Sequence, residues 1–224
     1  MKRHTWAAGI KVGLREQGHW LRRFSGRLPG RGLAVLLTLV LAWPATPGAA
    51  AGGAAEAALL AQLREGGHVL LVRHAATVPG TGDPPGFRLD DCATQRNLSD
   101  AGRAEARRLG EHLRAAGIPV AEVRSSAWCR SLDTVRLAFE PDLTVQHWAP
   151  LDSFFRGQGD ADSQTRAART EAARVPGDAN WVWVTHQVNI TALTGIHPAM
   201  GEVVVVRPAV AGDGVTVVGR WRPG

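Results

Sequence analysis

A short, mainly apolar run at residues 68–72 ends abruptly in Arg73 and His74, and it limits the possible folds more than any other stretch. Such a run next to glycines, here Gly66 and Gly67, is typical of a buried β-strand. Open α/β sheets bind ligands at the carboxyl ends of such strands. There, a guanidinium group can bind phosphate or carboxylate, and an imidazole can act as nucleophile, base or acid. For one isolated pair, a salt bridge or a cap is the commoner role.

The same pattern recurs at two later points in the chain. Residues 120–124 form a second strand-like run, followed by two serines and by Arg130 one turn into the next helix-like segment. Residues 181–185 form a third, strongly apolar run that ends in His186. If the three strands are parallel neighbours, two arginines and two histidines converge at one edge of the sheet.

Strand-like and helix-like segments alternate along the chain, which predicts an α/β fold. We expect a three-layer α/β/α sandwich with a mostly parallel central sheet. The expected strands are residues 68–72, 120–124, 143–148, 181–185, 202–207 and 214–221. The expected helices are residues 54–65, 100–116, 128–139, 163–174 and 188–194. The last two strands are expected to pair as a hairpin at a sheet edge. The Pro- and Gly-rich residues 78–97 predict a long loop of the kind that usually has a function.

The first 51 residues differ in composition from the rest of the chain. They hold eight basic residues and one acidic residue, and an apolar run at residues 33–42 is followed by Pro44 and three alanines at 49–51. This order is typical of a secretory signal peptide, with a mature chain that begins near Ala51 or Gly52. The sequence thus predicts a leader over residues 1–51, one domain over residues 52–224, and a periplasmic or secreted location.

Two other interpretations of this leader stay open. It could remain uncleaved and anchor the protein to the membrane, or the start codon could be placed too early. The apolar run is shorter than the ~20 residues that a transmembrane helix needs, so no stable membrane insertion is expected after cleavage. Without residues 1–51 the net charge changes from +6 to −1. The body of the chain is therefore not basic, and we expect no nucleic-acid partner.

The chain has two cysteines, Cys92 and Cys129. An even number of cysteines in an exported protein favours a disulfide, and two separate buried thiols are the alternative. Closing the long loop between them would stabilise the fold by about 4 kcal/mol on the chain-entropy model.

The residues at the three strand ends fit phosphoryl transfer. Two guanidinium groups and two imidazoles can surround one phosphoryl group, so that one imidazole attacks phosphorus while the cations stabilise the equatorial oxygens. This positive field makes a metal or another cofactor unnecessary. His68 and His74 do not have the i,i+4 spacing of helical metal ligands, and the sequence contains no clear metal-ligand cluster.

Four motifs, in this order and spacing, resemble the histidine phosphatase superfamily with its phosphoglycerate mutase-like fold. They are residues 71–77 (LVRHAAT), 97–102 (NLSDAG), 125–134 (SSAWCRSLDT) and 184–186 (VTH). The resemblance covers residues 68 to about 207 and is closer to the small phosphoglycerate mutase-like branch than to the phytase branch. It implies that His74 is the phosphate-accepting nucleophile. It also implies that Arg73, Arg130 and His186 complete the phosphate pocket, with His186 taking part in catalysis as well.

The leaving alcohol also needs a proton, for which a nearby acid is required. In many relatives a glutamate after the third strand supplies it, and the corresponding region here offers Asp152. A cap or turn role is an equally good interpretation of Asp152. Asp83, Asp90 and Asp91 in the long loop are alternatives for the acid.

These observations together predict an exported, metal-independent phosphomonoesterase that works through a phosphohistidine on His74. Its expected partner is a small phosphorylated substrate. A phosphate- or phosphopeptide-binding relative with little turnover remains an alternative, and so does a phosphotransferase or mutase. Arg88, Arg96 and Arg156 are candidates for binding an anionic substrate outside the phosphate pocket, with surface charge or ion pairing as the simpler interpretation.

Overall fold

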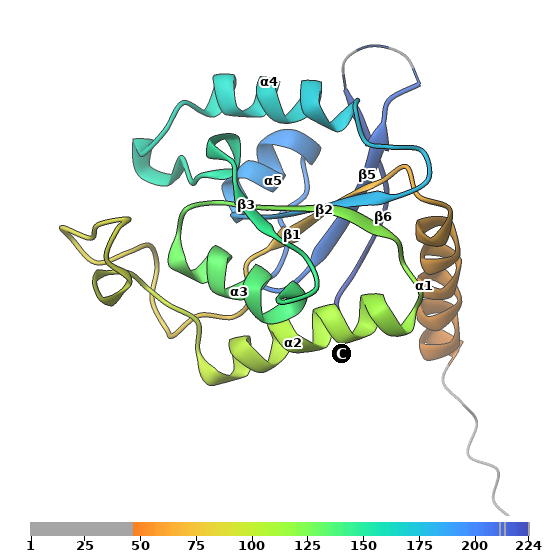
Figure 1. Cartoon of the computed structure of the whole chain (residues 1–224), viewed down its shortest axis with the longest axis horizontal. Coiled ribbons are helices and arrows are strands. Elements are labelled where there is room, and N and C mark those ends of the chain that lie inside the picture. Colours follow the sequence, from red (N-terminus) through yellow and green to blue (C-terminus); the bar gives the residue numbers. More distant parts are fainter. Residues whose placement is uncertain (1–46, 211, 213, 224) are drawn as a thin grey trace, which may run out of the picture. The chain divides into compact units, whose positions relative to one another are not determined.

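The structure, a computed structural model, describes residues 47–210, 212 and 214–223, with the backbone alone for residues 47–52 (Figure 1). Most of the predicted leader therefore lies outside the described residues. None of the helices in the described part is both long and apolar enough to cross a membrane.

Six strands form a single mixed sheet in the order β3-β2-β4-β1-β5-β6. The strands are β1 (Val69–Arg73), β2 (Val120–Ser125), β3 (Val145–His147), β4 (Asn180–Thr185), β5 (Val203–Pro208) and β6 (Val215–Trp221). Strands β1 to β4 run parallel, whereas β5 is antiparallel to both β1 and β6. The predicted parallel sheet and its edge hairpin are thus confirmed. Strands β2, β4 and β1 are direct neighbours, which brings the three strand ends together.

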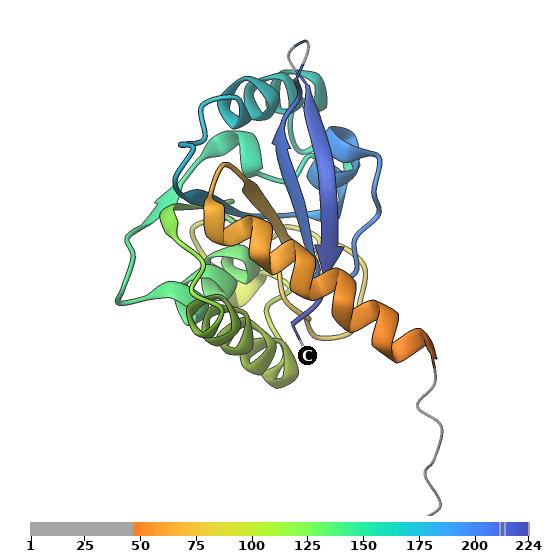
Figure 2. The ribbon, with the colours of Figure 1, turned by 90° about the vertical axis from the view of Figure 1, so that its right-hand side faces the viewer.

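Five helices cover the two faces of the sheet. They are α1 (Pro47–Glu65), α2 (Asp100–Ala115), α3 (Cys129–Phe139), α4 (Ala161–Ala172) and α5 (Gln187–Thr194). Helices α4 and α5 lie above the sheet in Figure 1, and α2 and α3 lie below it, while Figure 2 shows α1 crossing the strands of the hairpin obliquely. The predicted three-layer sandwich is therefore confirmed.

The alternation of strand side chains builds two separate cores. In β1, Leu70 and Val72 pack with α1, α2 and α3, whereas Val69 and Leu71 pack with α4 and α5. Because both faces are covered, all four of these side chains are buried, as expected for a central parallel strand. In a strand buried on both faces, polar residues are accommodated only at the end, and Arg73 is the last residue of β1.

Two details of the helices differ from or refine the sequence prediction. Helix α1 already begins at Pro47 and not at the expected residue 54, because the alanines here are strong helix formers. The predicted cleavage point near Ala51 therefore falls within α1. Ser99 caps α2 as predicted, its hydroxyl accepting the Gly102 N–H at 3.1 Å.

Candidate active site

The carboxyl ends of β1, β2 and β4 open into a cavity of about 220 Å³. All four residues of the predicted phosphate pocket line it: Arg73, His74, Arg130 and His186. The other lining residues come from the loop after β1 and from the segments before α4 and around α5: Gly80, Thr81, Gly82, Arg96, Ser153, Phe155, Gln187, Val188 and Met200. Strand order and register thus unite residues that lie more than a hundred positions apart.

His74 is held in a defined orientation at the end of β1. Its side chain is buried, and its Nδ1 lies 2.9 Å from the carbonyl oxygen of Ala75. A carbonyl can only accept, so Nδ1 carries the proton and Nε2 keeps its lone pair. Its backbone N–H donates to Thr185 of β4 at 3.0 Å. Burial, and next the positive charge of Arg130, lower the pKa of His74 from 6.5 to about 3, so the imidazole is neutral at neutral pH.

His186 faces His74 from the end of β4. The two ring centroids are 5.5 Å apart in an edge-on arrangement, and the Trp128 ring packs against His186 at 5.2 Å. The His186 Nε2 is hydrogen-bonded to the Ser126 hydroxyl at 2.8 Å. Burial, followed by the charge of Arg130, lowers the pKa of His186 well below its usual value. Two neutral imidazoles therefore lie side by side among cations.

The two predicted arginines are each anchored through a single nitrogen. Nη1 of Arg73 donates to the Pro198 carbonyl at 2.9 Å, and Nη1 of Arg130 donates to Asp83 at 2.7 Å. Arg130 and Asp83 are both almost completely buried. Burial by itself would raise the pKa of the Asp83 carboxyl, but hydrogen bonds from Arg130 and the Arg96 backbone hold it below its usual value. Asp83 is therefore ionised and forms a buried ion pair with Arg130.

Arg96 is one of the three arginines expected outside the phosphate pocket, but it lies inside the cavity. Its Nη1 donates to the Thr77 hydroxyl at 2.6 Å and to the Gly80 carbonyl at 2.9 Å. Arg88, in contrast, is largely exposed and pairs with Asp90 at the surface. The loop from residue 78 to residue 97 has no periodic pattern, so no local signal distinguishes the two arginines.

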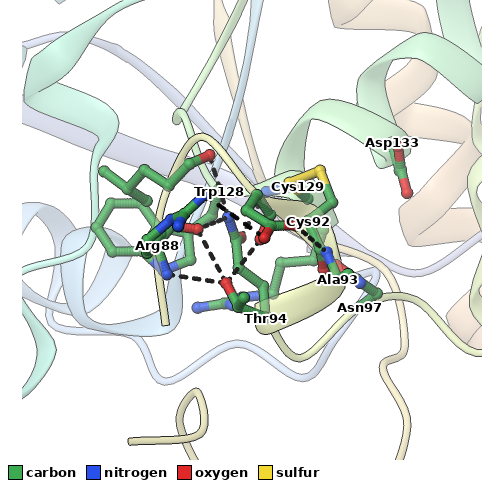
Figure 3. Close-up of a disulfide and its surroundings, with 12 residues drawn as sticks. Arg88, Cys92, Ala93, Thr94, Asn97, Trp128, Cys129 and Asp133 are labelled. Carbon is green, nitrogen blue, oxygen red and sulfur yellow. Dashed lines mark hydrogen bonds and ion pairs between the residues drawn. A yellow bond between two sulfur atoms is a disulfide. The ribbon is translucent and has the colours of Figure 1, made fainter. Parts of the chain in front are cut away.

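A disulfide joins this loop to α3, as the sequence predicted (Figure 3). Cys92 and Cys129 have Cα atoms 5.7 Å apart. Beside the bridge, the Gln95 side chain accepts the Cys129 N–H at 3.0 Å, and Asn97 donates to the Cys92 carbonyl at 2.6 Å. Arg130 directly follows Cys129, so the disulfide attaches the loop to the helix position next to a residue of the cavity wall.

The structure does not place Asp152 among the residues that line the cavity, where its expected role as the acid would put it. The carboxylate accepts the Ala127 N–H at 2.7 Å and lies 3.1 Å from Nε2 of His147. The 3₁₀ turn Ala149–Leu151 aims this side chain back at the segment between β2 and α3. Asp152 thus fits the alternative of a turn-stabilising residue.

The loop aspartates do not replace Asp152 as an acid. Asp83 is ionised by its contact with Arg130, Asp90 is exposed, and Asp91 caps a short 3₁₀ turn by accepting the Ala93 N–H. Within the described part of the chain, none of the residues that line the cavity carries a carboxylate. The cavity wall therefore combines cations, neutral imidazoles and small polar groups.

The fold and this wall define an α/β protein with a cationic, histidine-containing pocket at the carboxyl edge of its sheet. The sequence profile of the histidine phosphatase superfamily (branch 1) matches residues 69–174. This match over residues 69–174 confirms the resemblance to the histidine phosphatase superfamily seen in the sequence motifs.

Solved structures share this fold at low sequence identity. The protein histidine phosphatase SixA, solved with tungstate, is 14% identical with a TM-score of 0.51, and the match covers 70% of this chain and 97% of SixA. A candidate phosphohistidine phosphatase SixA from Nakamurella multipartitia is 21% identical with a TM-score of 0.50, covering 70% and 96%. No curated protein sequence matches the chain. At these identities the structural likeness concerns the fold alone.

Proposed function

We propose that this protein is a phosphatase that hydrolyses phosphate monoesters in two steps through a phosphohistidine on Nε2 of His74. The observation that carries the proposal is the hydrogen bond from Nδ1 of His74 to the Ala75 carbonyl. This bond fixes the tautomer that leaves Nε2 unprotonated, and the low pKa keeps it so at neutral pH. The match to the superfamily over residues 69–174 supports phosphatase activity in general.

In the first step, Nε2 of His74 attacks phosphorus, and the bond from phosphorus to the leaving oxygen breaks with its electron pair. Arg73 and Arg130 stabilise the charge on the equatorial oxygens, and His186 contacts the same group from the end of β4. In the second step, water attacks the phosphohistidine, gives up a proton, and His74 returns with its lone pair as inorganic phosphate forms.

In this mechanism, no carboxylate of the cavity wall donates a proton to the leaving group. Leaving groups that are stable as anions then depart most readily, because they need no protonation in the transition state. We therefore expect activated aryl phosphates to react much faster than alkyl phosphates.

We also propose that residues 1–51 are a leader and that the protein works outside the cytosol. Two observations support this: the basic and apolar composition of the leader, and the disulfide, since such bonds persist mainly in oxidising compartments.

The decisive experiment is to trap the covalent intermediate. The full chain is mixed with an aryl phosphate labelled on phosphorus and quenched in alkali, in which phosphohistidine survives. Label on the peptide that contains His74 is the expected result, and His74→Ala should abolish both label and turnover. His112→Gln, on α2, serves as the control and should keep both. A folded protein that shows neither turnover nor label would refute the phosphatase proposal.

A second candidate function is a phosphate-binding protein with little turnover. The observation in its favour is that no carboxylate lines the cavity within the described residues. This alternative predicts that the wild-type protein binds an oxyanion but that no label is trapped on His74.

A further inference from the structure

The cavity contains a third guanidinium group that the two-arginine pocket does not require. Arg96 reaches it from the long loop and not from a strand end, and it is held from two directions by Thr77 and Gly80. Its backbone N–H also donates to Asp83 at 3.0 Å. Three polar contacts thus hold Arg96 in place, which indicates a built arrangement and not a mobile surface charge.

All three arginines of the cavity share one bonding pattern. In each of them, Nη1 is anchored to a protein oxygen, whereas Nε is buried and has no hydrogen-bond partner among the described residues. The three are Arg73, Arg96 and Arg130. Leaving a buried charged donor unpaired is costly. An anion in the cavity would compensate all three groups at once.

The charges around the cavity add up to an excess of two. Three guanidinium groups face a single carboxylate, Asp83, which pairs with Arg130, and the two imidazoles are neutral. Two buried glutamates nearby, Glu105 and Glu202, are each paired with an arginine outside the cavity: Arg222 and Arg220. A phosphate monoester carries a charge of about −1.5 to −2 at neutral pH, so the excess matches a monoester and not a singly charged diester.

Arg96 supplies half of this excess. Because Arg130 is neutralised by Asp83, removing Arg96 would leave Arg73 as the one uncompensated cation of the described cavity wall. Burial, and next the charge of Arg96, lower the pKa of Arg73, which is consistent with two like charges that repel each other in a confined space. A dianion would relieve this repulsion, whereas a monoanion would relieve it only in part.

We propose that Arg96 binds the phosphoryl oxygens together with Arg73 and Arg130 and makes the cavity selective for doubly charged tetrahedral anions. The proposal rests on the proposed function in that it takes a phosphoryl group as the ligand of the cavity. It adds the residue that sets the preference for monoesters over diesters.

Tungstate and perrhenate provide the test, since they are tetrahedral oxyanions of similar size with charges of −2 and −1. Their binding to the full chain is measured by calorimetry in a phosphate-free buffer above neutral pH. We expect the wild type to prefer tungstate by roughly tenfold or more, the equivalent of about 1.4 kcal/mol. Arg96→Gln should weaken tungstate binding by roughly tenfold or more and perrhenate binding by much less.

Two further variants separate charge from position. Arg96→Lys keeps the charge and should retain most of the preference for tungstate. Thr77→Val removes one of the two anchors of the Arg96 guanidinium and should weaken tungstate binding to an intermediate extent. Arg88→Gln is the matched control, because it removes an exposed arginine of the same loop, and it should leave both affinities unchanged.

Equal affinity of the wild type for the two anions would overturn the proposal, as would an equal loss of both in Arg96→Gln. The wild-type comparison decides the question even if that variant fails to fold. Selective tungstate binding without any turnover would uphold the role of Arg96 and refute the phosphatase function. A turnover assay with an aryl monoester and the matching diester gives the kinetic counterpart: Arg96→Gln should narrow the ratio of their kcat/KM values.

Discussion

At the scale of single residues, the environment of each side chain determines its chemistry. Ionised Asp83 pairs with Arg130 and is unable to donate a proton, whereas His74 is kept neutral by burial and neighbouring cations. Asp152 neither pairs with an arginine of the cavity nor lies among its cations. Its carboxylate accepts a backbone N–H and contacts His147, outside the cavity.

We therefore predict that Asp152→Ala acts through structure and not through proton transfer. Losing the acceptor of the Ala127 N–H should lower the free energy of unfolding by about 1–3 kcal/mol, measured by urea denaturation. Any loss of kcat/KM should be the same factor for aryl phosphates with good and with poor leaving groups. A loss concentrated on the poor leaving groups would instead restore Asp152 to the role of general acid.

At the scale of elements, the long loop and α3 act as one unit because covalent and polar contacts join them. The disulfide connects Cys92 to the first residue of α3, and the ion pair with Asp83 connects the loop to the next residue of the helix, Arg130. The loop also carries Arg96 to the cavity. The conformation of the loop therefore determines the positions of two of the three cations, Arg96 and Arg130.

We predict that the double variant Cys92→Ser/Cys129→Ser is less stable and binds phosphate more weakly. On the chain-entropy model the loss in free energy of unfolding is about 4 kcal/mol. Since the loop would be held less firmly, KM for an aryl phosphate should rise more than kcat falls. The measurements are urea denaturation and steady-state kinetics. An unchanged KM in a folded variant would show that the loop keeps its position without the disulfide.

The contact of α2 with the end of β1 depends on a glycine. A Cβ at Gly102 would overlap the Ala76 carbonyl oxygen, so α2 would have to move away from the segment after His74. We predict that Gly102→Ala lowers the free energy of unfolding by about 1–3 kcal/mol. The control is Gly53→Ala in α1, where the added Cβ meets no neighbour and should stabilise the helix by about 0.5–1 kcal/mol. Equal changes in the two variants would contradict the close approach.

At the scale of the whole molecule, the buried histidines link folding to pH. The pKa of His74 is 6.5 when unperturbed and about 3 in the folded protein, and that of His186 is also lowered. Below about pH 6.5 the unfolded chain takes up protons that the folded chain does not bind. The folded state therefore loses stability as the pH falls from about 6.5 towards 3.

We predict a free energy of unfolding that is clearly smaller at about pH 5 than at about pH 7.5, with a weaker dependence in His74→Asn. Inorganic phosphate should restore part of the stability at the lower pH, because an anion in the cavity favours the protonated imidazoles. Urea denaturation with and without phosphate measures both effects. A pH dependence that is unchanged by His74→Asn would contradict the linkage.

Much of this fold could be predicted from the sequence because the relevant signals are local. Apolar runs with sharp polar ends predicted the central strands, and chain order with parallel pairing brought Arg73, His74, Arg130 and His186 to one edge. The pairing of Cys92 with Cys129 followed from their number. These features repeat with the period of a strand or helix, or depend on counting, and so they can be seen without coordinates.

Tertiary structure alone decided which charged side chains of the irregular segments enter the cavity. Arg96 and Arg88 lie in the same loop, yet one lines the cavity and the other pairs at the surface. Asp152 follows the third strand, as expected for the acid, but a 3₁₀ turn directs its carboxylate to the Ala127 N–H and not into the cavity. Loops have no periodicity, and their side chains are placed by contacts distant in sequence, such as the ion pair of Asp83 with Arg130. The sequence therefore determines the two histidines and two arginines at or just beyond the strand ends. Packing determines the third cation and the carboxylate-free wall of the described cavity.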